Sequence, residues 1–94
     1  MAAKLENIFK VLSEPNRLRI LKCLEDSEKC VCMIYKKLDL PQNLISHHLA
    51  VMRKHKVLNY RREGKSIYYS VNQETFKVLN KFVKRLDKYQ CWIE

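Results

Sequence analysis

Residues 42–54 alternate between apolar and polar positions with the period of an α-helix. The apolar positions follow the i, i+3, i+4, i+7 spacing of a buried stripe and are Ile45, His48, Leu49 and Met52. The opposite face starts with short polar side chains and ends with cations: Asn43, Ser46, His47, Ala50, Arg53 and Lys54. Such a face suits a helix that reads base edges in the major groove of DNA. An ordinary amphipathic surface helix is the alternative.

Three further helices are predicted ahead of this one, over about residues 3–12, 15–26 and 31–38. Pro15 is suited to the first position of its helix, where a missing N–H costs nothing. Their expected inward residues are Leu5, Ile8, Phe9 and Leu12, then Leu18, Leu21 and Leu24, then Ile34 and Leu38. Residues 39–41 form the turn into the helix described first.

The period changes to two after residue 56, which predicts strands over residues 57–62 and 66–71. Gly64, the one glycine of the chain, lies between them. A tight hairpin turn needs a positive φ, and glycine adopts it without steric cost. The sequence therefore predicts a two-stranded hairpin, or wing, over about residues 57–71.

A last helix is predicted over about residues 75–92. A mainly apolar seam recurs at alternating steps of three and four, at Phe76, Leu79, Val83, Leu86, Gln90 and Ile93. Packing inside one subunit is the alternative to pairing with a second copy. We favour pairing, because a chain of 94 residues has little core left to cover so long a stripe.

The expected fold class is mainly α (α+β): one winged helix-turn-helix domain over residues 1–94, with about five helices and a two-stranded wing. The recognition helix is residues 42–54. The homodimer would form through the first and last helices, over about residues 3–12 and 75–92.

The charge of the chain is distributed unevenly. Residues 1–28 carry five basic and five acidic side chains, whereas residues 52–94 carry eleven basic and four acidic ones, within a total of +9. This asymmetry indicates a polyanionic partner, with double-stranded DNA first and an anionic membrane surface second. No apolar run is long enough to cross a bilayer and no signal peptide is recognisable, so we expect a cytoplasmic protein.

The expected DNA contacts fall into two groups. Side chains that can bond base edges stand early on the recognition helix: Gln42, Asn43, Ser46 and His47. Cations for phosphate stand at its end and on the wing: Arg53, Lys54, Arg61, Arg62 and Lys65. The alternative for the cations is a solvated surface. No cofactor is expected to be needed for DNA binding. Catalysis is not expected either, because no phosphate-cradling loop, paired carboxylates or Ser/His/Asp set is present.

The cysteines divide into a buried candidate and a candidate ion site. Cys23 is expected to be a small buried apolar side chain. Cys30 and Cys32 stand near the start of a short helix, which favours their thiolates. Two thiolates do not complete a site for a soft ion, and Cys91 of the same or a partner subunit is the candidate third ligand. Ion sensing, thiol redox sensing and no sensing role remain open for the pair.

Four stretches together resemble the ArsR/SmtB family of metal-responsive repressors. They are Leu-Ser-Glu-Pro-Asn-Arg-Leu-Arg-Ile-Leu at 12–21, Cys-Val-Cys at 30–32, Ser-His-His-Leu at 46–49, and Gly-Lys at 64–65 followed by Tyr-Tyr-Ser-Val at 68–71. The resemblance implies a homodimeric winged-helix repressor that releases operator DNA when an inducer binds. The candidate inducers are As(III), Cd(II), Pb(II) and Zn(II).

The chain departs from that family pattern in places that bear on the inducer. Tyr35 stands where arsenic-responsive members often carry a third cysteine, and no cysteine precedes Cys23. The last helix has no histidine to complete the family's zinc site. Pro41 stands where a serine commonly caps the recognition helix, and it offers no capping oxygen.

Overall fold

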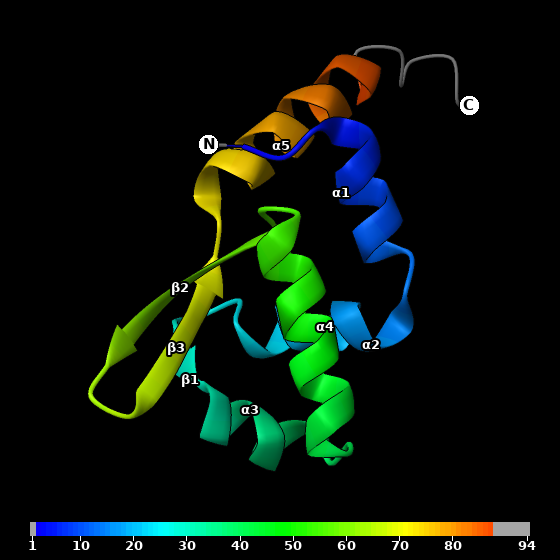
Figure 1. The fold of residues 1–94 in the computed structure, drawn as a ribbon. Helices are drawn as coiled ribbons and strands as arrows, with labels where there is room; N and C mark the ends of the chain where they lie inside the picture. The colour runs from blue at the N-terminus through cyan, green and yellow to red at the C-terminus, as the bar shows by residue number, and fades with distance from the viewer. Residues whose placement is uncertain (1, 88–94) are drawn as a thin grey trace.

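The computed structural model describes residues 2–87 (Figure 1). Within that range there are five helices and three strands. In chain order they are α1 (Leu5–Leu12), α2 (Pro15–Cys23), β1 (Lys29–Cys30), α3 (Val31–Leu38), α4 (Gln42–Lys54), β2 (Leu58–Glu63), β3 (Ser66–Val71) and α5 (Gln73–Asp87). The expected winged helix-turn-helix architecture is confirmed.

The helix-turn-helix is formed by α3 and α4, whose bounds agree with the sequence prediction. Asp39 adopts a left-handed conformation, with φ of 49°, which reverses the chain after α3. Pro41 then precedes α4 with φ of −55° and makes no side-chain cap, as its chemistry requires. All four residues of the predicted stripe on α4 are buried. The three apolar ones, Ile45, Leu49 and Met52, pack on the inward residues of α2 and α3 and on Val57 in a single core.

The sequence prediction for the inward faces of α1 and α2 was wrong for one side chain on each helix. Leu18 is 44% exposed, because α2 buries Ile20 and Cys23 and a residue two positions before Ile20 faces the opposite side. The helix also ends at Cys23 rather than near residue 26. On α1 the buried residues are Ile8 and Val11, whereas Phe9 is 49% exposed and its ring meets Phe82 of α5 edge-on.

The sheet has one strand more than the predicted hairpin. β2 and β3 pair in antiparallel register from Leu58 opposite Val71 to Glu63 opposite Ser66, and Gly64 in the turn has φ of 61° as expected. A short β1 adds to the free edge of β3, so that Cys30 lies opposite Tyr68 and the sheet order is β1-β3-β2. A strand of two residues is too short to show a period of two in the sequence. The wing is thereby hydrogen-bonded to the segment that carries Cys30.

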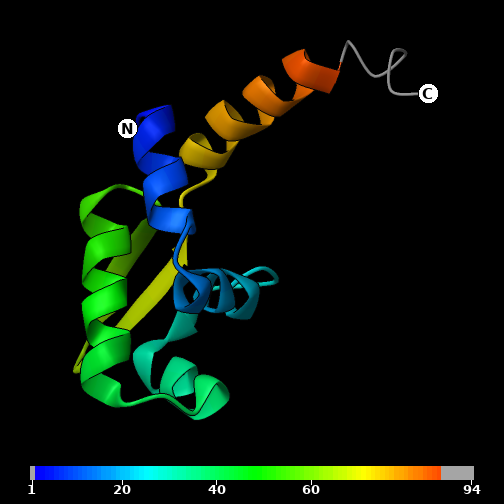
Figure 2. The ribbon, with the colours of Figure 1, turned by 90° about the vertical axis from the view of Figure 1, so that its right-hand side faces the viewer.

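The helix α5 projects from one end of the fold, with α1 alongside its first part (Figure 2). Thr75 fixes the start of α5, because its hydroxyl donates to the Lys56 carbonyl at 2.6 Å and accepts from the Ala3 N–H at 3.0 Å. Several apolar side chains of α5 are exposed in the single subunit: Val78, Val83 and Leu86. The predicted continuation of this helix to residue 92 lies outside the described residues. No helix within residues 2–87 is long and apolar enough to span a membrane.

Candidate nucleic-acid interface

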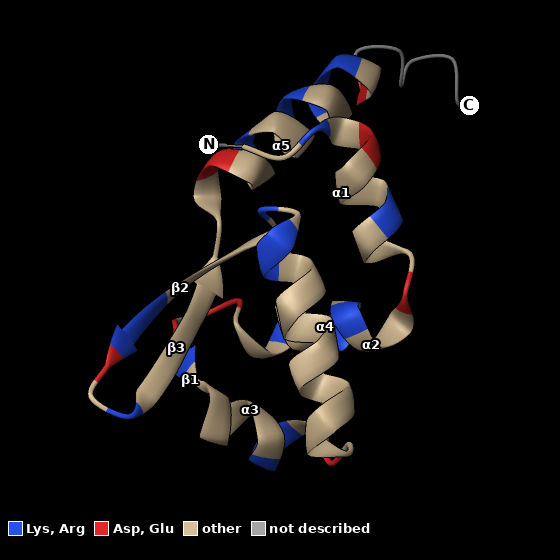
Figure 3. Cartoon of the chain, in the orientation of Figure 1, with Lys and Arg blue, Asp and Glu red and all other residues tan. Residues whose placement is uncertain are grey.

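The outer face of α4 is open to solvent along its whole length. The side chains predicted to reach base edges are all exposed and stand on its first two turns: Gln42, Asn43, Ser46 and His47. Arg53 and Lys54 are exposed on its last turn. Figure 3 shows further basic positions near the far end of β2 and at the hairpin turn, away from the end of α4. The structure therefore places the two predicted groups of residues on one helix and the adjoining wing.

The inner face of α4 is anchored by a buried histidine. His48 is 6% exposed, and its Nδ1 accepts a hydrogen bond from Nε of Arg17 at 3.2 Å. Its Nε2 lies 3.2 Å from Oε2 of Glu14, an oxygen that has no other hydrogen-bond partner among residues 2–87. An accepting Nδ1 puts the proton of the neutral ring on Nε2, facing that carboxylate. The histidine is buried, as its place on the predicted stripe requires, and ties the start of α2 to α4.

Burial favours the neutral form of the His48 ring. Removal from water lowers the pKa of His48 below its usual value, and the carboxylate of Glu14 opposes that shift. The positive charge of Arg17 and the neighbouring His47 side chain add to the lowering of this pKa. Because the Arg17 hydrogen bond needs an unprotonated Nδ1, a protonated ring would break the contact between α2 and α4.

Arg61 on the wing is held by two carboxylates. Its Nη2 lies 2.6 Å from Oε1 of Glu28, its Nε donates to both oxygens of that carboxylate, and its Nη1 lies 3.2 Å from Oε2 of Glu63. The guanidinium also stacks over the ring of Tyr68, 4.5 Å from its centroid. The ion pair lowers the pKa of Glu28 and raises that of Arg61. Much of the charge on Arg61 is therefore compensated within the subunit.

The other wing cations are placed differently. Arg62 and Lys65 are exposed, and neither forms an ion pair with any residue of the range 2–87. Arg53 stacks over the ring of Tyr60, 4.6 Å from its centroid, and so joins the end of α4 to β2. The Arg53–Tyr60 contact thus links the basic end of α4 to the first part of the wing, whereas Arg62 and Lys65 lie towards the hairpin turn.

Two residues that the sequence prediction did not assign to the site contact it directly. Glu28 binds Arg61 across 33 positions of the chain, and the hydroxyl of Tyr35 lies 2.7 Å from Oγ of Ser46. Neither contact has a signal in the local sequence, because the partners are brought together by the packing of α3 and β1 against α4 and the wing.

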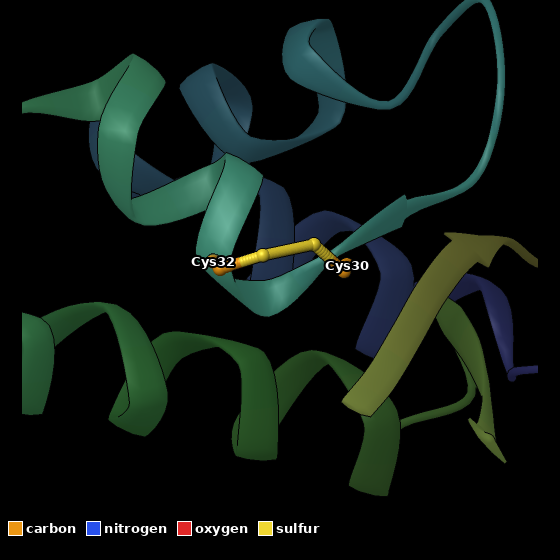
Figure 4. Close-up of a disulfide and its surroundings, with 2 residues drawn as sticks. All are labelled: Cys30 and Cys32. Atoms are coloured by element: carbon orange, nitrogen blue, oxygen red, sulfur yellow. A yellow bond between two sulfur atoms is a disulfide. The ribbon is translucent and has the colours of Figure 1, made fainter. Parts of the chain in front are cut away.

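Cys30 and Cys32 are joined by a disulfide at the start of α3 (Figure 4). They line a cavity of about 260 Å³ together with Lys65, Ser66 and Ile67 of the wing. Cys23 is buried with a free thiol, as expected. Cys91 lies outside the described residues. Within residues 2–87 no three side chains of His, Cys, Asp or Glu are grouped as a metal site.

Comparisons with known proteins agree with this architecture. Residues 14–60 match the family model of the bacterial regulatory protein, arsR family. The chain is 39% identical over 84 residues to an uncharacterized HTH-type transcriptional regulator of Methanocaldococcus jannaschii, a match that covers 88% of this chain and 94% of that one. It is 32% identical over 77 residues to an arsenical resistance operon repressor of Staphylococcus xylosus, covering 82% and 74% of the two chains.

Other relatives extend the comparison in length and in structure. The chain is 33% identical to a transcriptional repressor SmtB homolog of Synechocystis, a match that covers 74% of this chain and 53% of that one. It is 36% identical to a cadmium resistance transcriptional regulatory protein CadC homolog of Staphylococcus aureus, covering 77% of this chain and 60% of that one. The solved structure of HlyU from Vibrio cholerae superposes with a TM-score of 0.72 at 30% identity, covering 85% of this chain and 87% of that one. The chain therefore belongs to the arsR family of DNA-binding transcriptional regulators, which are not enzymes.

Proposed function

We propose that this chain is a cytoplasmic, homodimeric repressor that a soft ion bound by Cys30 and Cys32 releases from operator DNA. The observation that carries the proposal is the position of the cysteine pair. It begins the first helix of the helix-turn-helix, and β1, which ends at Cys30, is paired with the wing strand β3. A change at the two sulfurs therefore acts directly on elements that carry the DNA contacts.

The division of DNA contacts follows from the exposed side chains of α4 and the wing. Gln42, Asn43, Ser46 and His47 would contact base edges, because a helix in the major groove presents its first turns to the bases. Arg53, Lys54, Arg62 and Lys65 would contact phosphate, and Arg61 would join them once released from its carboxylates. No cofactor is part of this contact set.

The dimer would cover the apolar face that α1 and α5 leave exposed. Phe9 on α1 and Val83 and Leu86 on α5 are each about half exposed, at 49%, 52% and 57%. Within residues 2–87 the single subunit leaves about half of each side chain uncovered, and a second copy would bury the remainder by a helix–helix contact. A two-fold dimer would also present two recognition helices to two half-sites of an operator.

The ion site would be built on the cysteine pair and completed from elsewhere. The sulfurs of Cys30 and Cys32 already meet in the disulfide, with 5.4 Å between the two Cα atoms, so both reduced thiolates can converge on one ion. Trivalent arsenic takes three ligands and cadmium or zinc four, and Cys91 of either subunit is our candidate for a third. As(III), Cd(II), Pb(II) and Zn(II) remain the candidate ions. The names of two relatives, an arsenical resistance repressor and a cadmium resistance regulator, support this class.

The disulfide itself favours a second candidate function, in which oxidation of the pair is the signal. Loss of two electrons and two protons to an oxidant joins the two sulfurs and removes both as ligands. In this case the reduced and oxidised proteins would differ in DNA affinity without any ion.

One titration separates the two candidates. DNA affinity is measured with excess reductant, with and without As(III) or Cd(II), and again after oxidation. The ion proposal expects release by the ion alone, and loss of release but not of DNA binding in Cys30→Ser or Cys32→Ser. Cys23→Ser is the matched control, because that thiol is buried in the core. Release on oxidation alone would replace the ion proposal by the redox one, and no response to either would exclude both.

The same titration has a reciprocal check. If the ion weakens DNA binding by some factor, operator DNA must weaken ion binding by the same factor. Ion affinity that is unchanged by saturating operator DNA would contradict release through this site.

A further inference from the structure

Tyr35 of α3 forms a hydrogen bond with Ser46 on the outer face of α4. Among the hydrogen bonds of residues 2–87, no other joins α3 to a side chain on that face. We propose that Tyr35 is a specificity-determining positioning residue, whose hydroxyl fixes the direction in which Ser46 presents its own hydroxyl to a base. The inference rests on the proposed function, because it takes α4 as the helix that reads operator DNA.

The geometry makes Tyr35 a rigid support. Its ring is half-buried and packs against the core, so the position of the phenolic oxygen is set by the fold. That oxygen lies 2.7 Å from Oγ of Ser46, the usual length of a good O–H···O hydrogen bond. Ser46 is exposed on the second turn of α4, so its remaining hydrogen-bonding capacity points to whatever lies against this face.

The chemistry of the two hydroxyls decides what Ser46 offers. A serine hydroxyl has one proton and two lone pairs and rotates freely, whereas a phenol is the more acidic group and the better donor. When Tyr35 donates to Ser46, the serine proton is directed away from Tyr35 and towards the DNA. Ser46 can then donate to purine N7, guanine O6 or thymine O4 in a direction that the Tyr35 hydrogen bond fixes, and its one remaining lone pair is held in a fixed direction as well.

Removing the phenolic oxygen should therefore relax base preference without weakening binding to phosphate. In Tyr35→Phe the ring and its packing remain, but Ser46 is free to rotate and to donate or accept. We expect the preference at one base-pair position to fall by about two- to tenfold, the worth of a single hydrogen bond. The salt dependence of binding should not change, because no phosphate contact is removed.

The test compares the base preferences of four variants with those of the wild type. Duplexes carrying each of the four base pairs at every operator position are titrated with wild type, Tyr35→Phe, Ser46→Ala, the double variant and Tyr69→Phe. The last removes a phenolic oxygen from a buried wing tyrosine outside the contact set. Tyr35→Phe and Ser46→Ala should flatten the same position, the double variant should be no worse than Ser46→Ala, and Tyr69→Phe should leave the profile unchanged.

Three results would overturn the proposal and each is distinguishable. A Tyr35→Phe profile equal to wild type, or flattening at a different position from Ser46→Ala, would show that Tyr35 does not position Ser46. An unchanged Ser46→Ala profile would show that Ser46 reads no base, while operator binding by the other residues stands. Failure of the wild type to prefer any duplex would instead remove the proposed function itself.

Discussion

Replacing Glu28 by glutamine should strengthen DNA binding, although Glu28 lies outside the recognition helix and the hairpin. Its carboxylate makes the shortest ion pair of Arg61, at 2.6 Å, and accepts from the Nε of the same side chain. Arg61 therefore has to leave this partner before it can contact phosphate. The substitution keeps the size of the side chain and removes the charge that competes with DNA.

The magnitude follows from the number of phosphate contacts. One additional contact makes the slope of log affinity against log salt more negative by about 0.9, which is about an eightfold change over a tenfold range of salt. We therefore expect Glu28→Gln to bind about five- to tenfold more tightly near 0.1 M salt. Glu63 stays in place as a weaker competitor, at 3.2 Å from the guanidinium, and keeps the gain below that of a free arginine.

Glu25→Gln is the matched control, because it removes the same charge from the same loop and Glu25 does not contact Arg61 among the ion pairs of residues 2–87. A general effect of net charge on DNA affinity would appear in both variants. Screening over about 10 Å at 0.1 M salt limits that effect in both. Anisotropy titrations of a labelled duplex at several salt concentrations measure both the affinity and the slope. Weaker binding by Glu28→Gln, or a salt slope equal to that of Glu25→Gln, would refute the reasoning. The Glu28–Arg61 ion pair would then serve to hold the wing in shape.

Three other predictions follow from the same contacts. Arg62→Ala should weaken binding to all duplexes alike and make the salt slope about one unit less negative, whereas a loss of base preference would contradict a phosphate contact. Sedimentation at micromolar concentration should give twice the chain mass, and Val83→Lys should shift it towards the monomer; a monomeric wild type would remove the α1–α5 interface. Because burial lowers the pKa of His48, the unfolded state binds a proton more readily than the folded state. The free energy of unfolding should therefore fall as the pH drops from the unfolded-state pKa of about 6.5 towards the lower folded-state pKa. Urea unfolding between about pH 7.5 and pH 5 checks this, and His48→Gln should lose that part of the pH dependence.

Local sequence patterns predicted the recognition helix and the wing because each has a strong local cause. The stripe of α4 repeats over several turns, and Pro41 stands immediately before its first residue. Gly64 marked the wing turn because only a residue that tolerates positive φ fits there. His48 was correctly read as structural because it falls on the apolar stripe rather than on the outer face.

The long-range contacts of this surface were not predictable in the same way. Glu28 and Arg61 are 33 positions apart, and β1, which brings them together, is two residues long. Leu18 has an apolar side chain at a plausible helical spacing, and only the packing of the neighbouring elements leaves it outside. Such features depend on tertiary packing, which overrides local pattern where a segment is short.

The central claim is that the outer face of α4 reads duplex DNA, and one competition measurement tests it most directly. A gel shift on the DNA upstream of the gene for this chain, with excess random duplex, compares wild type with Asn43→Ala. The wild type should retain the upstream fragment, and Asn43→Ala should still bind random DNA but lose about 1–3 kcal/mol of preference, as expected for a good base contact. A wild type with no preference, or an Asn43→Ala variant with the full preference, would contradict the claim.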